Sequence, residues 1–222
     1  MSQIPAPFAV PEPNAPHDCP LCPRLVAFRE ENRRKFPDWF NGPVPNWGDP
    51  APRLIIVGLA PGLRGANRTG RPFTGDYAGE LLYKTLLKFG LATGEFHADP
   101  GDTLRLTGVM IANGVRCVPP QNKPTPAEIK TCRRFLSATL DQHPTVKAYL
   151  VLGRIAHDQL LSTLGERRAA FPFGHGAQHV LSNGATLFDS YHCSRYNTNT
   201  GVLTEAMFED VVGRAARMAA AG

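Results

Sequence analysis

Short apolar runs that alternate with helical patterns constrain the fold of this chain more than any other feature. Residues 53–58 place Leu, Ile, Ile and Val in succession before a glycine, a pattern typical of a strand buried on both faces. Similar runs predict strands at residues 104–112, 147–152 and 186–190. Helical spacing and capping residues predict helices at residues 19–35, 78–89, 125–140, 155–164 and 203–220. This alternation predicts an α/β fold, a three-layer α/β/α sandwich with a mainly parallel central sheet of about four strands.

Two helix ends are specified by local chemistry. Thr125, Pro126 and Glu128 form a capping box with proline at the first helical position, which predicts that a helix begins there. Gly90 stands where the C-terminal cap of the 78–89 helix belongs, because glycine tolerates the left-handed backbone of such a cap.

The chain contains no internal repeat and no linker that would divide it into independent halves. We therefore expect a Pro-rich tail over residues 1–16 and one domain over residues 17–222. The tail lacks the basic start and apolar core of a secretory signal, and no apolar run reaches the length of a membrane span. Hydrophobic residues at 42% and charged residues at 19% fit a globular protein, and we expect a reducing, cytoplasmic location.

The net charge of +5 favours a polyanionic partner, because Lys and Arg that neutralise phosphates release bound counterions. A basic enzyme without such a partner explains the charge equally well. Among the five cysteines, Cys19 and Cys22 form a C-x-x-C pair, and Cys117 and Cys132 follow later. In a reducing compartment this pattern indicates metal ligation more than disulfides, and spacing alone slightly favours zinc over an iron–sulfur cluster. Cys193 has no assigned ligand role.

Three loops follow predicted strands and should meet, because parallel sheets bind ligands beyond the carboxyl ends of their strands. They cover the glycine-rich residues 58–79, residues 113–123 and residues 192–197. The first loop matches neither the P-loop nor the dinucleotide-binding fingerprint, which argues against an α/β enzyme of nucleotide or phosphate metabolism. From its pattern alone, a structural turn is the safer interpretation.

In this order the three loops resemble those of the uracil-DNA glycosylase superfamily, in particular its iron–sulfur families 4 and 5. The resemblance covers almost the whole chain from Cys19 onward, and its most specific part is the run Gly-Arg-Pro-Phe-Thr-Gly-Asp-Tyr-Ala-Gly over residues 70–79. Family 4 has Glu directly after the first glycine of this loop, whereas this chain has Leu59 and is similar to family 5 (type B). The third loop departs from the family, which usually has proline where this chain has Cys193, and so loses one restraint on the backbone.

The resemblance implies a monofunctional glycosylase that flips uracil out of double-stranded DNA and hydrolyses the N-glycosidic bond, leaving an abasic site. It also implies activity on hypoxanthine and other deaminated bases. We expect a monomer without a membrane partner, with residues 17–222 as the catalytic domain. A non-catalytic uracil-DNA damage-binding protein on the same fold is the alternative; the presence of both Asp76 and His192 favours the enzyme.

The resemblance also implies roles for single residues that, taken alone, would be better explained as core, turn or structural residues. Phe73 would stack on the base, and Asn113 would read its edge with a donor and an acceptor. His192 would donate a hydrogen bond to the base O2, and Asp76 would stabilise positive charge on the sugar and orient water. The other expected substrate-binding residues are Gly58, Leu59, Ala60, Ser194, Arg195 and Asn197.

Further residues receive roles outside the pocket. Arg195 and Tyr196 would wedge into the duplex or remain exposed as positioning residues. Candidate phosphate contacts are Arg71, Arg116 and Lys123. The resemblance tips the choice of metal group to a 4Fe-4S cluster that acts as a structural clasp, held by Cys19, Cys22, Cys117 and Cys132.

Overall fold

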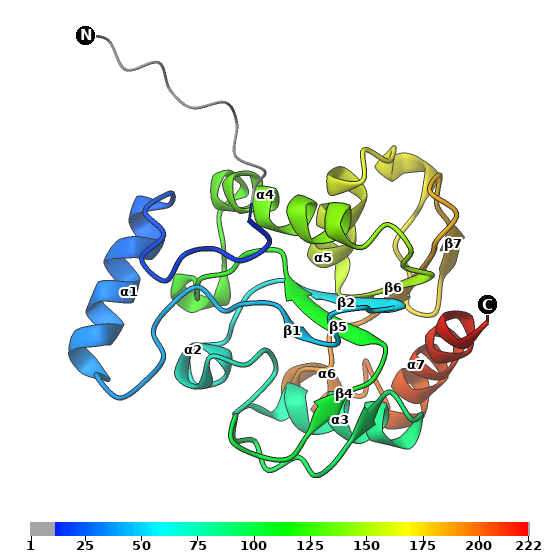
Figure 1. The fold of residues 1–222 in the computed structure, drawn as a ribbon, viewed down its shortest axis with the longest axis horizontal. Helices are drawn as coiled ribbons and strands as arrows, with labels where there is room; N and C mark the ends of the chain where they lie inside the picture. Colours follow the sequence, from blue (N-terminus) through cyan, green and yellow to red (C-terminus); the bar gives the residue numbers. More distant parts are fainter. Residues whose placement is uncertain (1–11, 222) are drawn as a thin grey trace, which may run out of the picture.

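A computed structural model describes residues 12–221, so residues 1–11 of the expected Pro-rich tail lie outside the described chain (Figure 1). A six-stranded sheet has the order β1-β5-β2-β6-β8-β7. Its inner strands run parallel: β5 (Val109–Asn113), β2 (Leu54–Gly58), β6 (Ala148–Leu152) and β8 (Thr186–Ser190). The edge strands β1 (Trp47–Gly48) and β7 (Gln178–Val180) pair antiparallel. The predicted four-stranded parallel sheet is confirmed, with one short strand added at each edge.

All four inner strands are buried along their whole length, because helices cover both faces of this sheet. On one face α3 (Tyr77–Lys88) and α7 (Glu205–Ala220) share a hydrophobic core with the strands. On the other face α4 (Pro126–Gln142) and α5 (Arg154–Thr163) form a second core. The predicted three-layer sandwich is therefore confirmed. No helix of the described residues has the length and apolar character needed to cross a membrane.

The remaining elements surround the sandwich. Helix α1 (Pro23–Lys35) lies beside one end of the sheet, at the left of Figure 1. It packs on α4 through Leu25 and Phe135. The shorter elements are α2 (Ala66–Thr69), β3 (Ala92–Thr93), β4 (Arg105–Leu106), η1 (Pro120–Asn122), η2 (Arg168–Ala170) and α6 (Arg195–Asn199).

Two predicted boundaries are wrong for local reasons. The single strand expected over residues 104–112 is divided into β4 and β5, because Gly108 turns the chain with a φ of 65° between them. The first helix begins at Pro23 instead of Cys19, since proline is tolerated at the first helical position but not inside a helix.

Both predicted helix ends are confirmed. The Thr125 hydroxyl accepts a hydrogen bond from the Glu128 N–H at 3.3 Å, and the Thr125 N–H donates to Glu128 Oε2 at 2.7 Å. Gly90 follows α3 with a φ of 69°.

A buried ion pair fastens the loop after β2 to the β3–β4 hairpin. The Arg71 guanidinium donates to both carboxylate oxygens of Asp102, at 2.7 and 2.8 Å. Its Nε donates to the Thr74 hydroxyl at 2.7 Å, and its face lies 5.0 Å from the ring centroid of Trp47. With 3% of its surface exposed, Arg71 holds the loop in place, and the hypothesis that it contacts phosphate is wrong.

Arg116 is also misassigned as a phosphate contact. Its side chain is fully buried and donates hydrogen bonds to Asn46, to the Thr139 hydroxyl and to the Pro13 carbonyl. These contacts tie residues near the start of the described chain to α4. Lys123, the third candidate, is exposed.

The Arg71–Asp102 pair predicts a specific pH dependence of stability. Hydrogen bonds from Arg71 lower the pKa of Asp102 to about 2, so the contribution of this carboxylate is present above its unfolded pKa of about 4 and is lost as pH falls through about 2. Breaking a buried pair costs about 3–5 kcal/mol, so Asp102→Asn should lower the free energy of unfolding by that amount at pH 7. Urea unfolding should show this difference shrinking as the pH falls from about 4 toward 2.

The exposed carboxylate Asp38 offers a matched control, and Asp38→Asn should leave stability almost unchanged at each pH. A deficit of Asp102→Asn that stays constant down to the lowest pH would show that the pair contributes no charge-dependent stability.

Candidate active site

A cavity of about 520 Å³ opens at the carboxyl ends of the parallel strands, where α/β sheets bind ligands. Its volume lies in the range of small-molecule sites. All three loops singled out in the sequence contribute to its wall. The lining residues are Leu59, Ala60, Pro61, Gly62, Ala66, Phe73, Asp76, Tyr77, Ala78, Asn113, Asn122, His192, Ser194 and Arg195.

Two lining residues of the cavity, Asn113 and Phe73, pack against the bare Cα of Gly58, which is not itself a lining residue. The register of β2 and β5 pairs Gly58 with Asn113. A Cβ at Gly58 would lie 2.5 Å from Asn113 Oδ1 and 3.0 Å from Cζ of Phe73, so both side chains pack where only glycine leaves room. Asn113 is 3% exposed, and within the described chain its side-chain amide makes no hydrogen bond to another residue. Its donor and acceptor are therefore available to a ligand.

Phe73 forms a flat wall of the cavity. Its backbone is left-handed, with a φ of 50°, which is uncommon for a residue with a side chain. Gly79 permits this conformation, because a Cβ there would overlap the Phe73 carbonyl oxygen. The Phe73 ring faces His192, with centroids 6.1 Å apart and planes inclined by 30°. The two rings together favour a planar ligand.

Asp76 is held by the helix that it caps. One carboxylate oxygen accepts a hydrogen bond from the Gly79 N–H at 3.4 Å at the start of α3. The other lies against Gly62 and Gly65, and a side chain at Gly65 would clash with it. The positive end of the α3 dipole favours the anionic carboxylate. The cavity thus contains a fixed negative charge.

His192 follows β8 and is neutral at physiological pH. Burial lowers its pKa, and the negative charge of Asp76 only partly opposes this shift. A neutral imidazole has one N–H with which to donate to a developing anion. The Asn197 side chain donates to the His192 carbonyl at 2.8 Å, and Ser194 caps α6 by accepting from the Asn197 N–H at 3.3 Å. Asn197 therefore braces the loop and is not among the lining residues.

Cys193 ties the His192 loop to α3. It is fully buried, and its thiol lies 3.5 Å from the Ala78 carbonyl oxygen, which it reaches as a donor. Burial raises its pKa to about 12. Packing therefore supplies a restraint at the position where the sequence lacks proline.

Six lining residues were not among the predicted site residues: Pro61, Gly62, Ala66, Tyr77, Ala78 and Asn122. Tyr77 stands directly after Asp76 and lies under Arg195, whose guanidinium carbon is 5.4 Å from the tyrosine ring centroid. Its position within the glycine-rich run of residues 70–79 could have indicated that Tyr77 belongs to the site. Asn122, at the end of η1, carried no pattern that separates it from a turn residue. Tyr196, the other wedge candidate, is 74% exposed.

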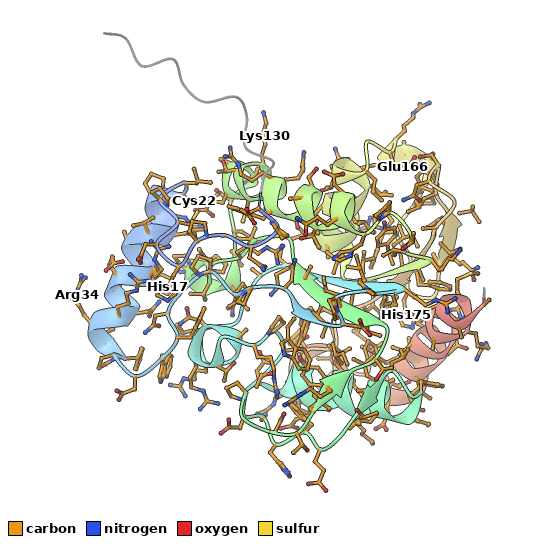
Figure 2. All side chains as sticks on the ribbon, viewed as in Figure 1. His17, Cys22, Arg34, Lys130, Glu166 and His175 are labelled. Atoms are coloured by element: carbon orange, nitrogen blue, oxygen red, sulfur yellow. The ribbon has the colours of Figure 1, made fainter. Side chains whose placement is uncertain are left out.

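A second, smaller cavity contains four cysteines. Cys19, Cys22, Cys117 and Cys132 are free thiols and belong to one buried cluster with Leu25 and Phe135. Figure 2 shows Cys22 at the beginning of α1. Within residues 12–221, no three side chains of Cys, His, Asp or Glu are arranged to hold a single metal ion. In an iron–sulfur cluster each thiolate binds a different iron, so the sulfurs stand further apart than around one ion.

Two buried arginines give the thiol cluster a positive environment. Arg29 Nη1 lies 3.9 Å from Cys117 Sγ, and the backbone N–H of Arg116 donates to Cys132 Sγ at 3.3 Å. The positive charge of Arg116 also acts to lower the pKa of Cys132, against the larger effect of burial. The Nε atoms of both arginines are buried without a hydrogen-bond partner among the described residues. Burial raises the pKa of Cys117 to about 12 and that of Cys132 to about 11, so metal binding must displace their protons. Four thiolates carrying a metal group fit this arrangement.

Comparisons with known proteins agree with the geometry. The family model of the uracil DNA glycosylase superfamily matches residues 45–215, a range that includes every residue lining the larger cavity. The chain is 50% identical to the type-5 uracil-DNA glycosylase of Thermus thermophilus, over 90% of this chain and 94% of that protein. Its identity to the type-5 enzyme of Mycobacterium tuberculosis is 43%, over 90% and 78%. With a type-4 uracil-DNA glycosylase of Pyrobaculum aerophilum it shares 32% identity over 56% of each chain.

The packing at Gly58 predicts the effect of one added methyl group. Gly58→Ala must displace Asn113 or Phe73, and a misplacement of about 1 Å in a site can cost about 100-fold in rate. We expect a loss of that order in base excision, the activity implied by the sequence, measured by single-turnover kinetics. Gly101→Ala is the control, because this exposed glycine has an ordinary backbone, and its Cβ would lie 3.3 Å from Oδ1 of the Asp99 side chain, which can move aside. Equal rates for both variants would remove Gly58 from the construction of the site.

Proposed function

This chain belongs to the uracil DNA glycosylase superfamily, and from that membership we propose that it is a type-5 glycosylase of DNA repair. It removes uracil from DNA by hydrolysing the N-glycosidic bond and leaves an abasic site. The observation that carries this function is the meeting of Asn113, Asp76 and His192 in one cavity at the carboxyl ends of the strands. Residues 17–222 form its catalytic domain.

The reacting bond is inaccessible inside a stacked duplex, so the nucleotide must leave the duplex and enter the cavity before it can react. Phe73 stacks on the flipped base. The Asn113 amide pairs with the uracil edge, donating to O4 and accepting from N3–H. Gly58, Leu59 and Ala60, at the end of β2, lie along one side of the base. Ser194 and Arg195 contact the nucleotide from the third loop.

Breaking the glycosidic bond separates charge, and the site opposes both charges. Negative charge develops on the departing base, where the neutral His192 donates a hydrogen bond to O2. Positive charge develops on the sugar, where the fixed carboxylate of Asp76 stabilises it. Asp76 also orients a water molecule and accepts its proton as the water oxygen bonds to C1′. The base leaves as an anion and is protonated by solvent.

We extend the substrate range to hypoxanthine and other deaminated bases. Leu59 presents an apolar side chain to the cavity at the position where family 4 has a carboxylate. An apolar wall imposes no hydrogen-bonding demand on that side of the base, and apolar contacts discriminate weakly between related ligands. Excision from a panel of duplexes with one lesion each measures this range.

The partner is double-stranded DNA. The net charge of +5 and the exposed Lys123 and Arg195 suit its phosphates, and Tyr196 is exposed enough to enter the gap left by the flipped base. We propose a monomer that acts in the cytoplasm, where reducing conditions keep its thiols available.

Cys19, Cys22, Cys117 and Cys132 would hold a 4Fe-4S cluster. Ligation by these four cysteines would tie the start of α1 to α4 and to the loop after β5. The positive charges of Arg29 and Arg116, which act to lower the pKa of Cys117 and of Cys132, would compensate part of the thiolate charge. The cluster takes no part in the glycosidic step.

A non-catalytic damage-binding protein would bind the same lesion. It would need Asn113 and Phe73 but neither the charge of Asp76 nor the donor of His192. Base release separates the two functions, and we would measure it on a duplex with one deoxyuridine under single-turnover conditions, with alkali revealing abasic sites. Tight binding without release would favour the damage-binding protein, and absence of binding would contradict both.

Asp76 offers a sharp test of the mechanism. Asp76→Asn keeps the cap of α3, because Asn is also a strong N-cap, but removes the negative charge. We expect single-turnover cleavage to fall by about 10²–10⁴-fold for both Asp76→Asn and Asp76→Ala, with duplex affinity largely retained. Unchanged cleavage in Asp76→Asn, with its fold verified by circular dichroism, would exclude the carboxylate charge from the mechanism.

The cluster predicts a metal content that is independent of activity. Protein purified without oxygen should show broad visible absorbance and about four irons per chain. Cys117→Ser should lose both, whereas Cys193→Ser should keep them, since Cys193 lies outside the thiol cluster. Colourless protein with one zinc per chain would contradict the assignment.

A further inference from the structure

A loop outside the cavity lies against the residue that precedes His192. The Tyr191 N–H donates a hydrogen bond to Nδ1 of His175 at 3.1 Å. The two rings stack with centroids 5.0 Å apart, and the Phe173 ring lies 6.2 Å from that of Tyr191. Figure 2 labels His175 beside α7. We call residues 171–177, between η2 and β7, the support loop.

The support loop is bonded to the end of β8 through its backbone. The Gly176 N–H donates to the Asp189 carbonyl at 2.8 Å, and the Asp189 N–H donates to the Ala177 carbonyl at 3.0 Å. From α7, Arg214 donates to the Gly176 carbonyl at 3.0 Å. These bonds fix the position of the support loop relative to the end of β8, which leads into the His192 loop.

A buried histidine–aspartate pair anchors the same loop from the other side. His157 Nδ1 lies 2.7 Å from Asp189 Oδ1, and its Nε2 lies 2.9 Å from the Phe171 carbonyl oxygen. Burial alone would lower the pKa of His157, but Asp189 and this carbonyl raise it above the usual value. Asp189 Oδ2 accepts from the Gly174 N–H at 3.3 Å. Asp189 therefore holds the support loop directly at Gly174 and, through His157, at Phe171.

The bond from Tyr191 identifies the tautomer of His175. Because Nδ1 accepts a hydrogen bond, it carries no proton, and the ring proton is on Nε2. Burial lowers the pKa of His175, and Arg214 lowers it further, against the opposing influence of the Met207 backbone and of Asp210. The ring is thus neutral near pH 7 and can act as an acceptor.

We propose that His175 is a positioning residue for catalysis, which holds the backbone from which His192 reaches the base. It accepts the first N–H beyond the end of β8, one residue before His192, and the anchors on Asp189 keep the acceptor in place. Without this acceptor the Tyr191 N–H loses its partner and the loop can shift. The inference rests on the proposed glycosylase function and adds a residue that lies outside the cavity.

The test compares two substitutions at His175. His175→Leu removes the acceptor, whereas His175→Asn places an amide oxygen near the position of Nδ1 and cannot titrate. Excision is measured in single turnover on duplexes containing uracil or 5-fluorouracil. We expect His175→Leu to slow uracil release about tenfold or more and 5-fluorouracil release by less, because the fluorinated base is a more stable anion that depends less on His192. His175→Asn should recover most of the uracil rate.

A double-substitution cycle with His192→Ala gives the second readout. If His175 acts through His192, adding His175→Leu to His192→Ala causes no further loss of rate. Equal losses for both bases, or a full additional loss in the His192→Ala protein, would overturn the inference and leave a structural role. Thermal midpoints and duplex affinity identify any variant that fails to fold.

The two proposals fail in different ways. A wild-type protein that releases no uracil overturns the proposed function, and the positioning role with it. An active wild type whose uracil rate is unaffected by His175→Leu overturns the positioning role alone.

Discussion

The parallel pairing of β5, β2, β6 and β8 is the constraint on which the rest of the molecule depends. In parallel strands all carboxyl ends meet at one edge of the sheet, so three loops that are distant in sequence converge there. The register sets Gly58 beside Asn113 and Leu152 beside Ser190, which leads directly into the His192 loop. Burial of the inner strands on both faces specifies this register, because their side chains must fit two helical layers at once.

At that edge of the sheet, glycines that let the backbone approach closely shape the site as much as the side chains do. Phe73 can turn into the cavity because Gly79 leaves room for its carbonyl, and Asp76 can face it because Gly65 has no side chain. Burial makes His192 a neutral donor, while the start of α3 keeps a carboxylate beside it.

The thiol cluster is not isolated from this cavity. Ala60 lines the cavity and also packs against the hydrophobic cluster that contains the cysteines, and Val115 of the second loop belongs to the same cluster. Order imposed on Cys117 and Cys132 would therefore reach the loops after β5 and β2, which carry Val115 and Ala60. This contact gives a physical route by which a structural metal group would stabilise the base-binding site.

The sequence by itself determined the features that depend on local chemistry. Apolar runs specified the four inner strands, the Thr125 capping box began α4, and the glycine-rich run with its aspartate marked the first loop of the site. Tertiary structure alone decided which polar residues face the cavity and which are buried in hydrogen bonds within the fold. Arg71 and Arg116 are residue types that often contact phosphate, yet both are buried. Arg71 is bonded to Asp102, 31 residues away, and Arg116 to the Phe135 carbonyl, 19 residues away. Asn197 and His175 support the His192 loop for the same reason: a hydrogen bond depends on where two atoms meet in space, which residue types along the chain do not encode.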